Sequence, residues 1–381
     1  MKKHILQLCG AALLAAGLVF PPPAAAAPVS KPWRIALVTG GPFIEFQITL
    51  QGLAQRLAEL GLIANGAIPM PEHDASQAPM LQWLAENAGG DTLHFVADAL
   101  YSPEWNPDRR AEVKNNLLER LRDRGDIDCI LAFGGWAGQD IAPEDVRIPV
   151  LVLAVPNAVA AGIVSSADDS GRDNLLAAVD PGRYERHVQV FHKIIGFSRL
   201  GIAYEDTPAG RDSIALKDIE AATGEEGVEL LRCTTADLYA FGGVEEAMRR
   251  RRACHEDLVR QGADAVYITY QVGMSHEYMP YVLEPLIRAG LPTFDQQGSL
   301  HVQCGVMLGM TSSSREEGFF AAAALEQILK GSLPRSLSQR FESTLSLAVN
   351  LYTAALIGWN LPMEVLAAVD EFYRDPIAIS R

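Results

Sequence analysis

The chain has 381 residues, more than one hydrophobic core usually organises, so two domains or lobes are expected. Hydrophobic residues make up 49% of the chain, an ordinary globular share, and the formal net charge is −15. So acidic a surface has no long-range attraction for nucleic acid or anionic lipid, and we expect no nucleic-acid partner.

The first residues predict export from the cytoplasm. Two lysines precede a short apolar run, 11–20, and four alanines follow at 24–27. This order of charge, apolar core and small residues is typical of a secretory signal peptide, here residues 1–26. The apolar run is too short to span a bilayer, which needs ~20 residues. We therefore expect cleavage after Ala26 and a periplasmic mature protein.

In the first half of the chain, short apolar runs alternate with longer amphipathic segments. The runs are typical of parallel strands buried on both faces, and the longer segments have helical spacing. A Gly134-Gly135 turn is expected after the third strand. The expected strands are 34–39, 92–97, 127–133 and 148–155, and the expected helices are 47–60 and 111–124.

The same alternation restarts at Arg199 in the second half of the chain. Two such series predict an α/β fold of two doubly wound lobes. In sheets of this kind, ligands bind beyond the carboxyl ends of the strands. The expected strands are 199–204, 228–233, 264–270 and 292–295, and the expected helices are 213–223, 244–261 and 279–289.

The long helix 244–261 contains four consecutive arginines, 249–252, which would suit a polyanion. Acidic residues at 245, 246, 256 and 257 flank this run at spacings that allow ion pairs on one helix face. We therefore interpret the arginine run as a solvated helix face.

Four cysteines follow the predicted signal peptide, and their wide spacing matches no CxxC metal or redox motif. In an oxidising compartment one pair could join, and Cys233 and Cys254 are the closest in sequence. Cys129 lies in a buried-strand pattern, where a thiol more often acts as a small apolar side chain. The sequence leaves open whether a disulfide forms.

Signals for catalysis are weak. The segment 273–277 (GMSHE) resembles a nucleophile elbow but lacks its second glycine, and the adjacent Ser275 and His276 do not define a catalytic pair. The histidines have neither HExxH nor another paired-ligand spacing. We expect no catalytic residue, no metal and no cofactor, and a secreted hydrolase is the weakest alternative.

Aromatic and polar residues gather at the expected carboxyl ends of the strands, as a small-molecule cleft requires. The turn Gly40-Gly41-Pro42 could offer backbone N–H groups to an anion, although it is neither a GxGxxG nor a Walker loop. The candidate ligand-binding residues are Gly41, Phe43, Glu45, Gly135, Trp136, Asn157, Glu205, Thr207, Tyr270, Gln271, Asp295 and Gln296.

From about Arg34 to Asp370, the chain resembles the substrate-binding proteins of ABC transporters, in the family that includes tryptophan- and tyrosine-type binding components. The order of the similar segments carries the resemblance more than any single motif does. These segments are 148–164 (IPVLVLAVPNAVAAGIV), 262–268 (GADAVYI), 291–300 (LPTFDQQGSL) and the tail 322–359, with ALEQILKGSLP and LAVNLYTAALIGWNLP.

The resemblance implies a type I periplasmic binding fold with three crossings between the lobes. Lobe one would hold 31–172 and 297–332, and lobe two would hold 175–295 and 335–381. A small ligand would lie between the lobes and drive hinge closure, with no enzyme activity. The chain would then be the solute-binding component of an ABC importer, with a membrane permease as its partner. The alternative is a periplasmic receptor for a membrane sensor kinase or chemoreceptor.

Two departures from the family pattern concern the ligand. Where the family often has Asp-Pro this chain has Pro156-Asn157, and a Thr-Asp-Asn-like turn is replaced by 269–271 (TYQ). The loss of two carboxylates leaves an amino acid and another organic or aromatic compound as alternative ligands. Phe43, Trp136 and Tyr270 are expected to cover its apolar part, and Asn157, Gln271 and Asp295 to orient its polar groups. Asp295, Glu45 or Glu205 could replace the lost carboxylates.

Overall fold

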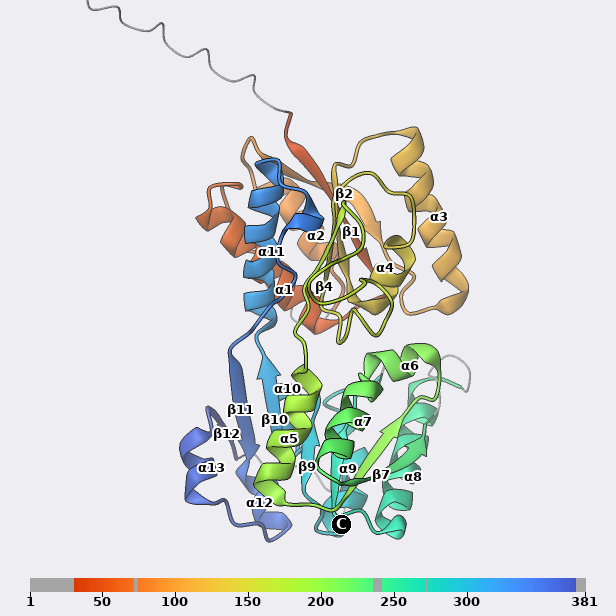
Figure 1. The fold of residues 1–381 in the computed structure, drawn as a ribbon, viewed down its shortest axis with the longest axis vertical. Helices are drawn as coiled ribbons and strands as arrows, with labels where there is room; N and C mark the ends of the chain where they lie inside the picture. Colours follow the sequence, from red (N-terminus) through yellow and green to blue (C-terminus); the bar gives the residue numbers. More distant parts are fainter. Residues whose placement is uncertain (1–30, 72–74, 236–241, 272, 375–381) are drawn as a thin grey trace, which may run out of the picture. The chain divides into compact units, whose positions relative to one another are not determined.

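The computed structural model describes residues 31–71, 75–235, 242–271 and 273–374. The predicted signal peptide, residues 1–26, lies outside this part of the chain. From residue 32 onward, the described chain contains a five-stranded and a seven-stranded sheet, which we call the sheets of lobe 1 and lobe 2 (Figure 1). Among the described residues, no helix is both long and apolar enough to cross a membrane.

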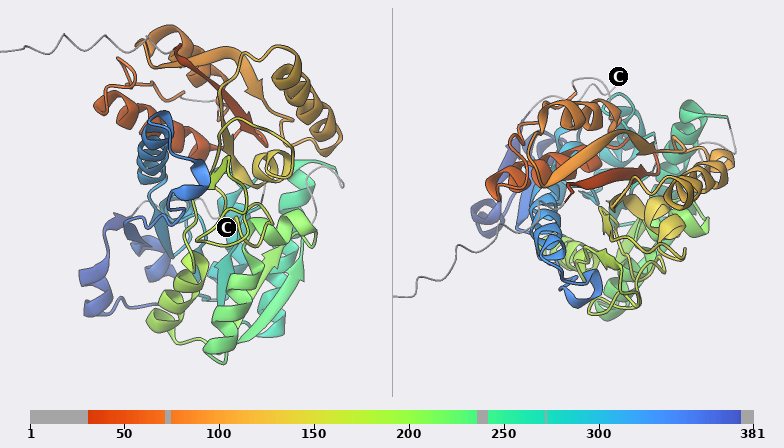
Figure 2. Two further views of the ribbon diagram at one scale, coloured as in Figure 1. Left: turned by 45° about the horizontal axis from the view of Figure 1, so that its top comes forward. Right: turned by 90° about the horizontal axis from the view of Figure 1, so that it is seen from above.

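Lobe 1 has the strand order β2-β1-β3-β4-β5, and every pair in its sheet is parallel. Its helices cover both faces of the sheet (Figure 2). Its elements are β1 (Trp33–Thr39), α1 (Ile44–Glu59), α2 (Ala78–Asn87), β2 (Leu93–Tyr101), α3 (Pro107–Asp123), β3 (Cys129–Phe133), α4 (Gly134–Ile141), β4 (Val150–Leu153), β5 (Leu175–Ala177), α11 (Ser314–Leu329) and the 3-10 turn η1 (Pro334–Ser336).

Lobe 2 has the strand order β12-β11-β10-β9-β8-β6-β7, in which only the β10–β11 pair is antiparallel. Its elements are α5 (Arg183–Ile195), β6 (Arg199–Tyr204), α6 (Pro208–Ser213), α7 (Leu216–Glu225), β7 (Glu229–Thr234), α8 (Val244–Gln261), β8 (Ala265–Ile268), α9 (Met279–Arg288), β9 (Thr293–Asp295), α10 (Ser299–Gln303), β10 (Leu308–Ser312), β11 (Leu345–Asn350), α12 (Leu351–Leu356), α13 (Met363–Ala368) and β12 (Glu371–Tyr373).

The predicted fold class, two doubly wound α/β lobes, is confirmed. In lobe 1, α1, α2 and α11 pack on one face of the sheet and α3 and α4 on the other. In lobe 2, α5 and α7 pack on one face and α8 and α9 on the other. The central strands are apolar along their whole length because both of their faces are buried in this way.

The chain crosses between the lobes in three places, but two of the expected boundaries are wrong. The segment 175–177 is β5, which pairs with β4, so the first crossing follows it rather than preceding it. The segment 297–312 belongs to lobe 2, because its strand β10 pairs with both β9 and β11. The second crossing therefore lies between β10 and α11, and the third precedes β11.

The expected Gly134-Gly135 turn is in fact the start of helix α4. Gly134 has a left-handed backbone, with φ of 85°, and the Phe46 ring occupies the space that a Cβ atom would need. Glycine is required at this position for both reasons. The consequence for the cavity is that Trp136 extends from the first turn of a helix rather than from a loop.

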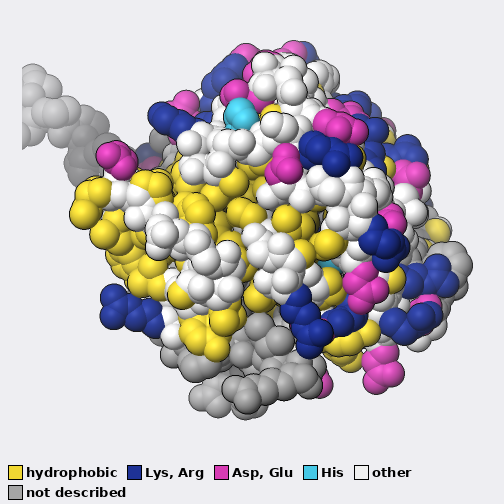
Figure 3. Space-filling model, turned by 90° about the horizontal axis from the view of Figure 1, so that it is seen from below, with side chains coloured by type: hydrophobic (Ala, Val, Ile, Leu, Met, Phe, Trp, Pro, Cys, Tyr) yellow, Lys and Arg dark blue, Asp and Glu magenta, His cyan; other side chains and the backbone are white. Residues whose placement is uncertain are grey.

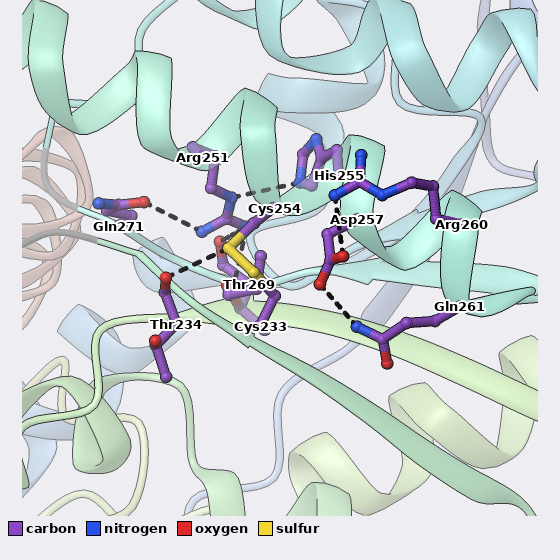
Figure 4. Close-up of a disulfide and its surroundings, with 11 residues drawn as sticks. Cys233, Thr234, Arg251, Cys254, His255, Asp257, Arg260, Gln261, Thr269 and Gln271 are labelled. Carbon is purple, nitrogen blue, oxygen red and sulfur yellow. Dashed lines mark hydrogen bonds and ion pairs between the residues drawn. A yellow bond between two sulfur atoms is a disulfide. The ribbon is translucent and has the colours of Figure 1, made fainter.

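A disulfide in lobe 2 joins Cys233 near the end of β7 to Cys254 in α8 (Figure 4). This is the pair that is closest in sequence, and its pairing settles what the sequence left open. Cys129 and Cys304 are free thiols, and both are buried.

The expected solvated face of the arginine run, 249–252, holds for only part of it. Two of these arginines pair with Glu246 on the surface of α8. Arg251 is instead fully buried and donates to the backbone oxygen of Thr269 at 2.8 Å and to the side-chain oxygen of Gln271 at 3.3 Å (Figure 4). The guanidinium of Arg251 therefore ties α8 to the segment that follows β8.

Exposed apolar side chains gather at the end of lobe 2 that faces away from lobe 1 (Figure 3). Leu356, Met363, Leu366 and Phe372, from α12, α13 and β12, are exposed there, and Met363 is 72% exposed. This apolar surface is separate from the strand ends at which ligands bind in folds of this kind.

Candidate functional site

A cavity of about 190 Å³ lies between the two lobes. Its walls are formed by residues that follow β1, β3 and β4 in lobe 1, and β6, β8, β9 and β10 in lobe 2. These are the carboxyl ends of the strands, where the sequence predicted a ligand site. Eight of the predicted residues line this cavity: Phe43, Glu45, Gly135, Trp136, Glu205, Thr207, Tyr270 and Gln296.

Aromatic rings form the wall that lobe 1 contributes. The ring of Trp136 lies 5.6 Å from that of Trp105 in an edge-to-face arrangement, and the guanidinium of Arg110 lies 4.8 Å above the Trp136 ring. Phe43 approaches Tyr270 of lobe 2 at 5.5 Å. Edge-to-face packing of this kind holds each ring in a fixed orientation, which makes the apolar wall rigid.

Trp105 was not among the predicted residues, and it explains why Gly41 does not line the cavity. The indole of Trp105 lies where a Cβ atom on either Gly40 or Gly41 would be, and its ring nitrogen donates to the Pro42 oxygen at 2.9 Å. The expected anion site at this turn is therefore covered by a tryptophan. Trp105 itself has an unusual left-handed backbone, with φ of 58°.

Two further predicted residues, Asp295 and Gln271, form hydrogen bonds inside lobe 2 and do not line the cavity. The carboxylate of Asp295 accepts from the His301 ring at 2.9 Å and from the backbone of Gln297 at 2.8 Å. Burial disfavours the charged His301 ring, but the Asp295 carboxylate outweighs it and raises the pKa of His301. The side-chain oxygen of Gln271 accepts from Arg251. Asp295 and Gln271 therefore support lobe 2 from behind the cavity wall.

Asn157 likewise does not line the cavity, because its side chain makes bonds elsewhere. Its amide nitrogen donates to the carboxylate of Asp218 on α7, across the two lobes, at 2.8 Å. Its amide oxygen accepts from the backbone of Ala160 at 2.9 Å. Asn157 therefore forms a contact between the lobes.

Two predicted residues at the lobe 2 edge of the cavity also have structural bonds. Thr207 caps helix α6, where its hydroxyl accepts from the Gly210 backbone at 2.9 Å. The side chain of Gln296 accepts from the Tyr270 backbone at 2.9 Å and donates to the Ser213 oxygen at 3.3 Å. Gln296 thereby fixes the position of Tyr270 in the wall.

Arg183 and Glu45 place opposite charges at the cavity. Within the described part of the chain, neither side chain makes a hydrogen bond or an ion pair, and the Nε atom of Arg183 is buried without a partner. The guanidinium of Arg183 lies 5.2 Å from the Tyr184 ring. Burial raises the pKa of Glu45, and the positive charge of Arg183 opposes that rise. Both groups are thus available to a bound molecule.

Glu317 adds a second buried carboxyl group to the cavity wall. One of its oxygens accepts from the backbone of Ala154 at 2.6 Å. Burial raises the pKa of Glu317 to about 7, although this bond and Arg183 both favour the charged form. Glu317 lies one turn after the second crossing between the lobes, so the cavity reaches the hinge.

The missed residues follow strands whose extent the sequence did not reveal. Trp105 follows β2, which runs to Tyr101 rather than ending at Ala97, and Arg183 follows β5, which was not predicted. The same strand-end rule would have found both residues from correct strand limits. The lining residues not predicted include Phe46, Trp105, Pro107, Gly134, Gln139, Ala154, Arg183, Tyr184, Asp212, Ser213, Gln297, Ser312, Ser313, Ser314, Glu317 and Phe341.

The residues considered for hydrolysis do not come together at this cavity. Ser275 and His276 are exposed, and neither lines the cavity. The His276 ring instead lies 3.0 Å from the sulfur of Cys304. Within the described ranges, no three His, Cys, Asp or Glu side chains lie close enough together to hold a metal ion.

No family model and no curated protein matches the chain. Solved structures do resemble it over 90% of its length and 100% of theirs. A conserved domain protein from Vibrio cholerae has 18% identity and a TM-score of 0.67, and an ABC domain in complex with L-Trp from Streptococcus pneumoniae has 14% and 0.66. A ligand-free, open substrate-binding protein with adhesive properties from Clostridium difficile has 14% and 0.61.

The chain has the type I periplasmic binding protein fold. Solute-binding proteins share this fold with LacI-family transcription regulators. At these identities the likeness shows the fold alone. The neighbours are binding proteins and regulators rather than enzymes.

Proposed function

We propose that this protein is the extracytoplasmic solute-binding component of an ABC importer and captures a small organic molecule between its two lobes. The observation that carries this proposal is the cavity, which combines an aromatic wall with the charged groups of Arg183 and Glu45. A buried polar group without a partner is costly, so such groups are retained where a ligand completes their bonds.

The charges indicate the class of the ligand. A guanidinium binds a carboxylate through two parallel hydrogen bonds, and a carboxylate such as Glu45 accepts from an ammonium group. The rings of Trp105, Trp136 and Phe43 suit an apolar or aromatic body between these charges. We infer a zwitterionic ligand with an apolar body, such as an amino acid, for which Glu45 takes the place of the carboxylates that the family pattern has elsewhere.

Export is part of the proposal. The predicted signal peptide supports it, and so does the Cys233–Cys254 disulfide, because disulfides persist in oxidising compartments. An importer function also requires a membrane permease as partner. The Streptococcus pneumoniae structure, an ABC domain in complex with L-Trp, supports both the transporter assignment and the ligand class.

A thermal-shift screen tests ligand capture. Matched compounds would be compared: aromatic and aliphatic amino acids, the amines and the acids that share their side chains, and sugars. A tight ligand raises the melting temperature by mass action, by several degrees at saturating concentration. Zwitterions are expected to give the largest shifts, and native mass spectrometry should recover the hit unmodified. A screen in which no compound of any class shifts the melting temperature would refute the proposal.

Uptake measurements test the transport output. Cells that lack the protein should lose high-affinity uptake of the radiolabelled hit, and the wild-type gene should restore it. An Arg183→Met gene should fail to restore uptake while giving the same protein level. If uptake is unchanged although the protein binds the compound, the sensory receptor replaces the importer component as the assignment.

A further inference from the structure

Two hydrogen bonds of the same kind connect the lobes beside the cavity. The amide nitrogen of Asn157 donates to Asp218 on α7 at 2.8 Å, and that of Gln139 on α4 donates to Asp212 on α6 at 3.2 Å. In each, lobe 1 provides the amide and lobe 2 provides the carboxylate. In both bonds, donor and acceptor are side chains of the protein.

Lobe 1 holds both amides in the orientation that these bonds require. The oxygen of Asn157 accepts from the Ala160 backbone at 2.9 Å, which leaves its nitrogen to face lobe 2. The oxygen of Gln139 accepts from Arg110 at 3.3 Å, and its nitrogen also donates to the Ala161 oxygen at 3.3 Å. Lobe 1 therefore presents two fixed donors, which reduces the entropy lost when the lobes close.

The carboxylate of Asp218 is largely buried where the two lobes meet. Its residue is 9% exposed, and burial raises its pKa to about 6, against the hydrogen bond from Asn157. Glu185 on α5 adds a negative charge that raises this pKa further. The phenols of Tyr184 on α5 and Tyr267 on β8 also lie within electrostatic reach of Asp218.

Asp212, the second acceptor, is in a similar position. Burial raises the pKa of Asp212, and the Gln139 bond and the positive charge of Lys217 oppose that rise. The neighbouring Arg211 is paired with Asp206 and so already has a partner. Both acceptors are therefore carboxylates between the lobes whose charged form is disfavoured by burial.

We propose that the Asn157–Asp218 and Gln139–Asp212 hydrogen bonds form a latch that closes the lobes without ligand and holds them more tightly in acid. This latch rests on the proposed function, since it regulates access to the same cavity. The latch differs from ligand-driven closure because all of its hydrogen-bond donors and acceptors belong to the protein.

The direction of the pH effect follows from where the carboxyl groups are buried. In an open form the Asp218 side chain would be exposed and have an ordinary pKa near 4. Between about pH 4 and 6, Asp218 then takes up a proton when the lobes close. The closed form is therefore most stable relative to the open form below this range, and this stabilisation is lost as the pH rises through it. For Asp218 alone the open–closed equilibrium should change by about 100-fold across the range.

Small-angle X-ray scattering of the purified protein tests the latch. Native mass spectrometry first shows that the sample carries no small molecule. The radius of gyration should fall as the pH is lowered from 7.5 to 4.5. Asn157→Ala and Gln139→Ala should each shift the protein toward the open form. Asp218→Asn keeps an oxygen that accepts from Asn157 but does not titrate, so this variant should stay closed across the range.

The matched control is Glu220→Gln, on the same helix as Asp218. Glu220 pairs with Arg232 in its own lobe, so this change should leave the pH profile as in the wild type. A radius of gyration independent of pH, or a profile that Asn157→Ala and Gln139→Ala leave unchanged, would overturn the latch. If a ligand binds but the radius of gyration does not depend on pH, the latch is refuted and the proposed function stands. If the radius of gyration depends on pH as expected but no ligand is found, the latch stands and the proposed function is refuted.

Discussion

The two walls of the cavity differ in chemistry. Lobe 1 provides Trp105 and Trp136, whose rings are in contact, and Phe43, which packs against Phe46. Lobe 2 provides mainly polar groups, such as Glu205 and Asp212. Burial against an aromatic wall is favourable but has little directional preference, and polar contacts fix orientation. The difference indicates a division of labour in which the rings of lobe 1 take the apolar body of a ligand, while its charged groups meet Arg183 of lobe 2 and Glu45 at the start of α1 in lobe 1.

The lobes also differ in how their walls are held. The aromatic wall depends on the Gly40-Gly41 turn, against which Trp105 packs, and on helix α4, which starts at Gly134. The polar wall depends on hydrogen bonds, such as those of Gln296, and on helix α8, which the Cys233–Cys254 disulfide joins to β7. Removing one support should therefore affect one wall at a time.

The largest effect is expected from the charged side of the cavity. Arg183→Met removes the only lining arginine or lysine among the described residues, and the affinity for the hit should fall by 100-fold or more, or about 3 kcal/mol. Isothermal titration calorimetry measures this loss. Arg186→Met is the matched control on the same helix, where Arg186 pairs with Asp180, and its affinity should be unchanged. Equal losses in both variants would show that the helix, rather than the charge, matters.

The disulfide should stabilise lobe 2 specifically. Replacing both Cys233 and Cys254 by serine removes a cross-link over 21 residues, which should lower the free energy of unfolding by about 3 kcal/mol in urea denaturation. Hydrogen exchange should increase in α8 and β7 but not in the sheet of lobe 1. Reduction of the wild type should reproduce the variant, and a uniform increase in both lobes would contradict separate support of the two walls.

The aromatic wall should contribute less per residue. Trp136→Ala removes one ring of that wall and should weaken binding of the hit by about 2 kcal/mol. Trp83→Ala is the control, because Trp83 packs against the core of lobe 1 without lining the cavity. Unchanged calorimetric affinity in the Trp136 variant would exclude this ring from the site.

The smallest effect concerns Glu317, a polar group in the apolar lobe. Burial raises its pKa to about 7, so its contribution to stability is complete below about pH 4 and is lost as the pH rises through 7. Glu317→Gln keeps an acceptor for the Ala154 N–H group but cannot ionise. The variant should lose less stability than the wild type between pH 5 and pH 8, by on the order of 1 kcal/mol, measured by urea denaturation at each pH. Parallel profiles would contradict a buried, titrating Glu317.

Sequence patterns predicted the fold class and the edge of the sheets at which the cavity lies. They succeeded where a strand is a continuous apolar run, as at 199–204, which the structure reproduces as β6. They failed at β5 and β10, because one has three residues and the other contains Gly309. Both failures lie at crossings, so they also displaced the lobe boundaries.

Side-chain direction was the second limit of the sequence. Asn157 and Asp295 were placed correctly at strand ends, but each turns toward a partner outside the cavity, Asp218 and His301. His301 is only six residues from Asp295 in sequence, but periodicity does not show that the two side chains meet. Asp218 is 61 residues from Asn157, and only tertiary packing brings these two together. A strand-end rule therefore locates a site but does not choose among the residues around it.

The central claim is that a ligand is bound between two chemically different walls. Hydrogen–deuterium exchange tests it most directly, measured with and without the compound that gives the largest thermal shift. Ligand should protect segments 133–139 in lobe 1 and 204–213 in lobe 2 together, because a molecule between the lobes contacts both. Protection confined to one lobe, or absent from both segments although the compound binds, would contradict this account.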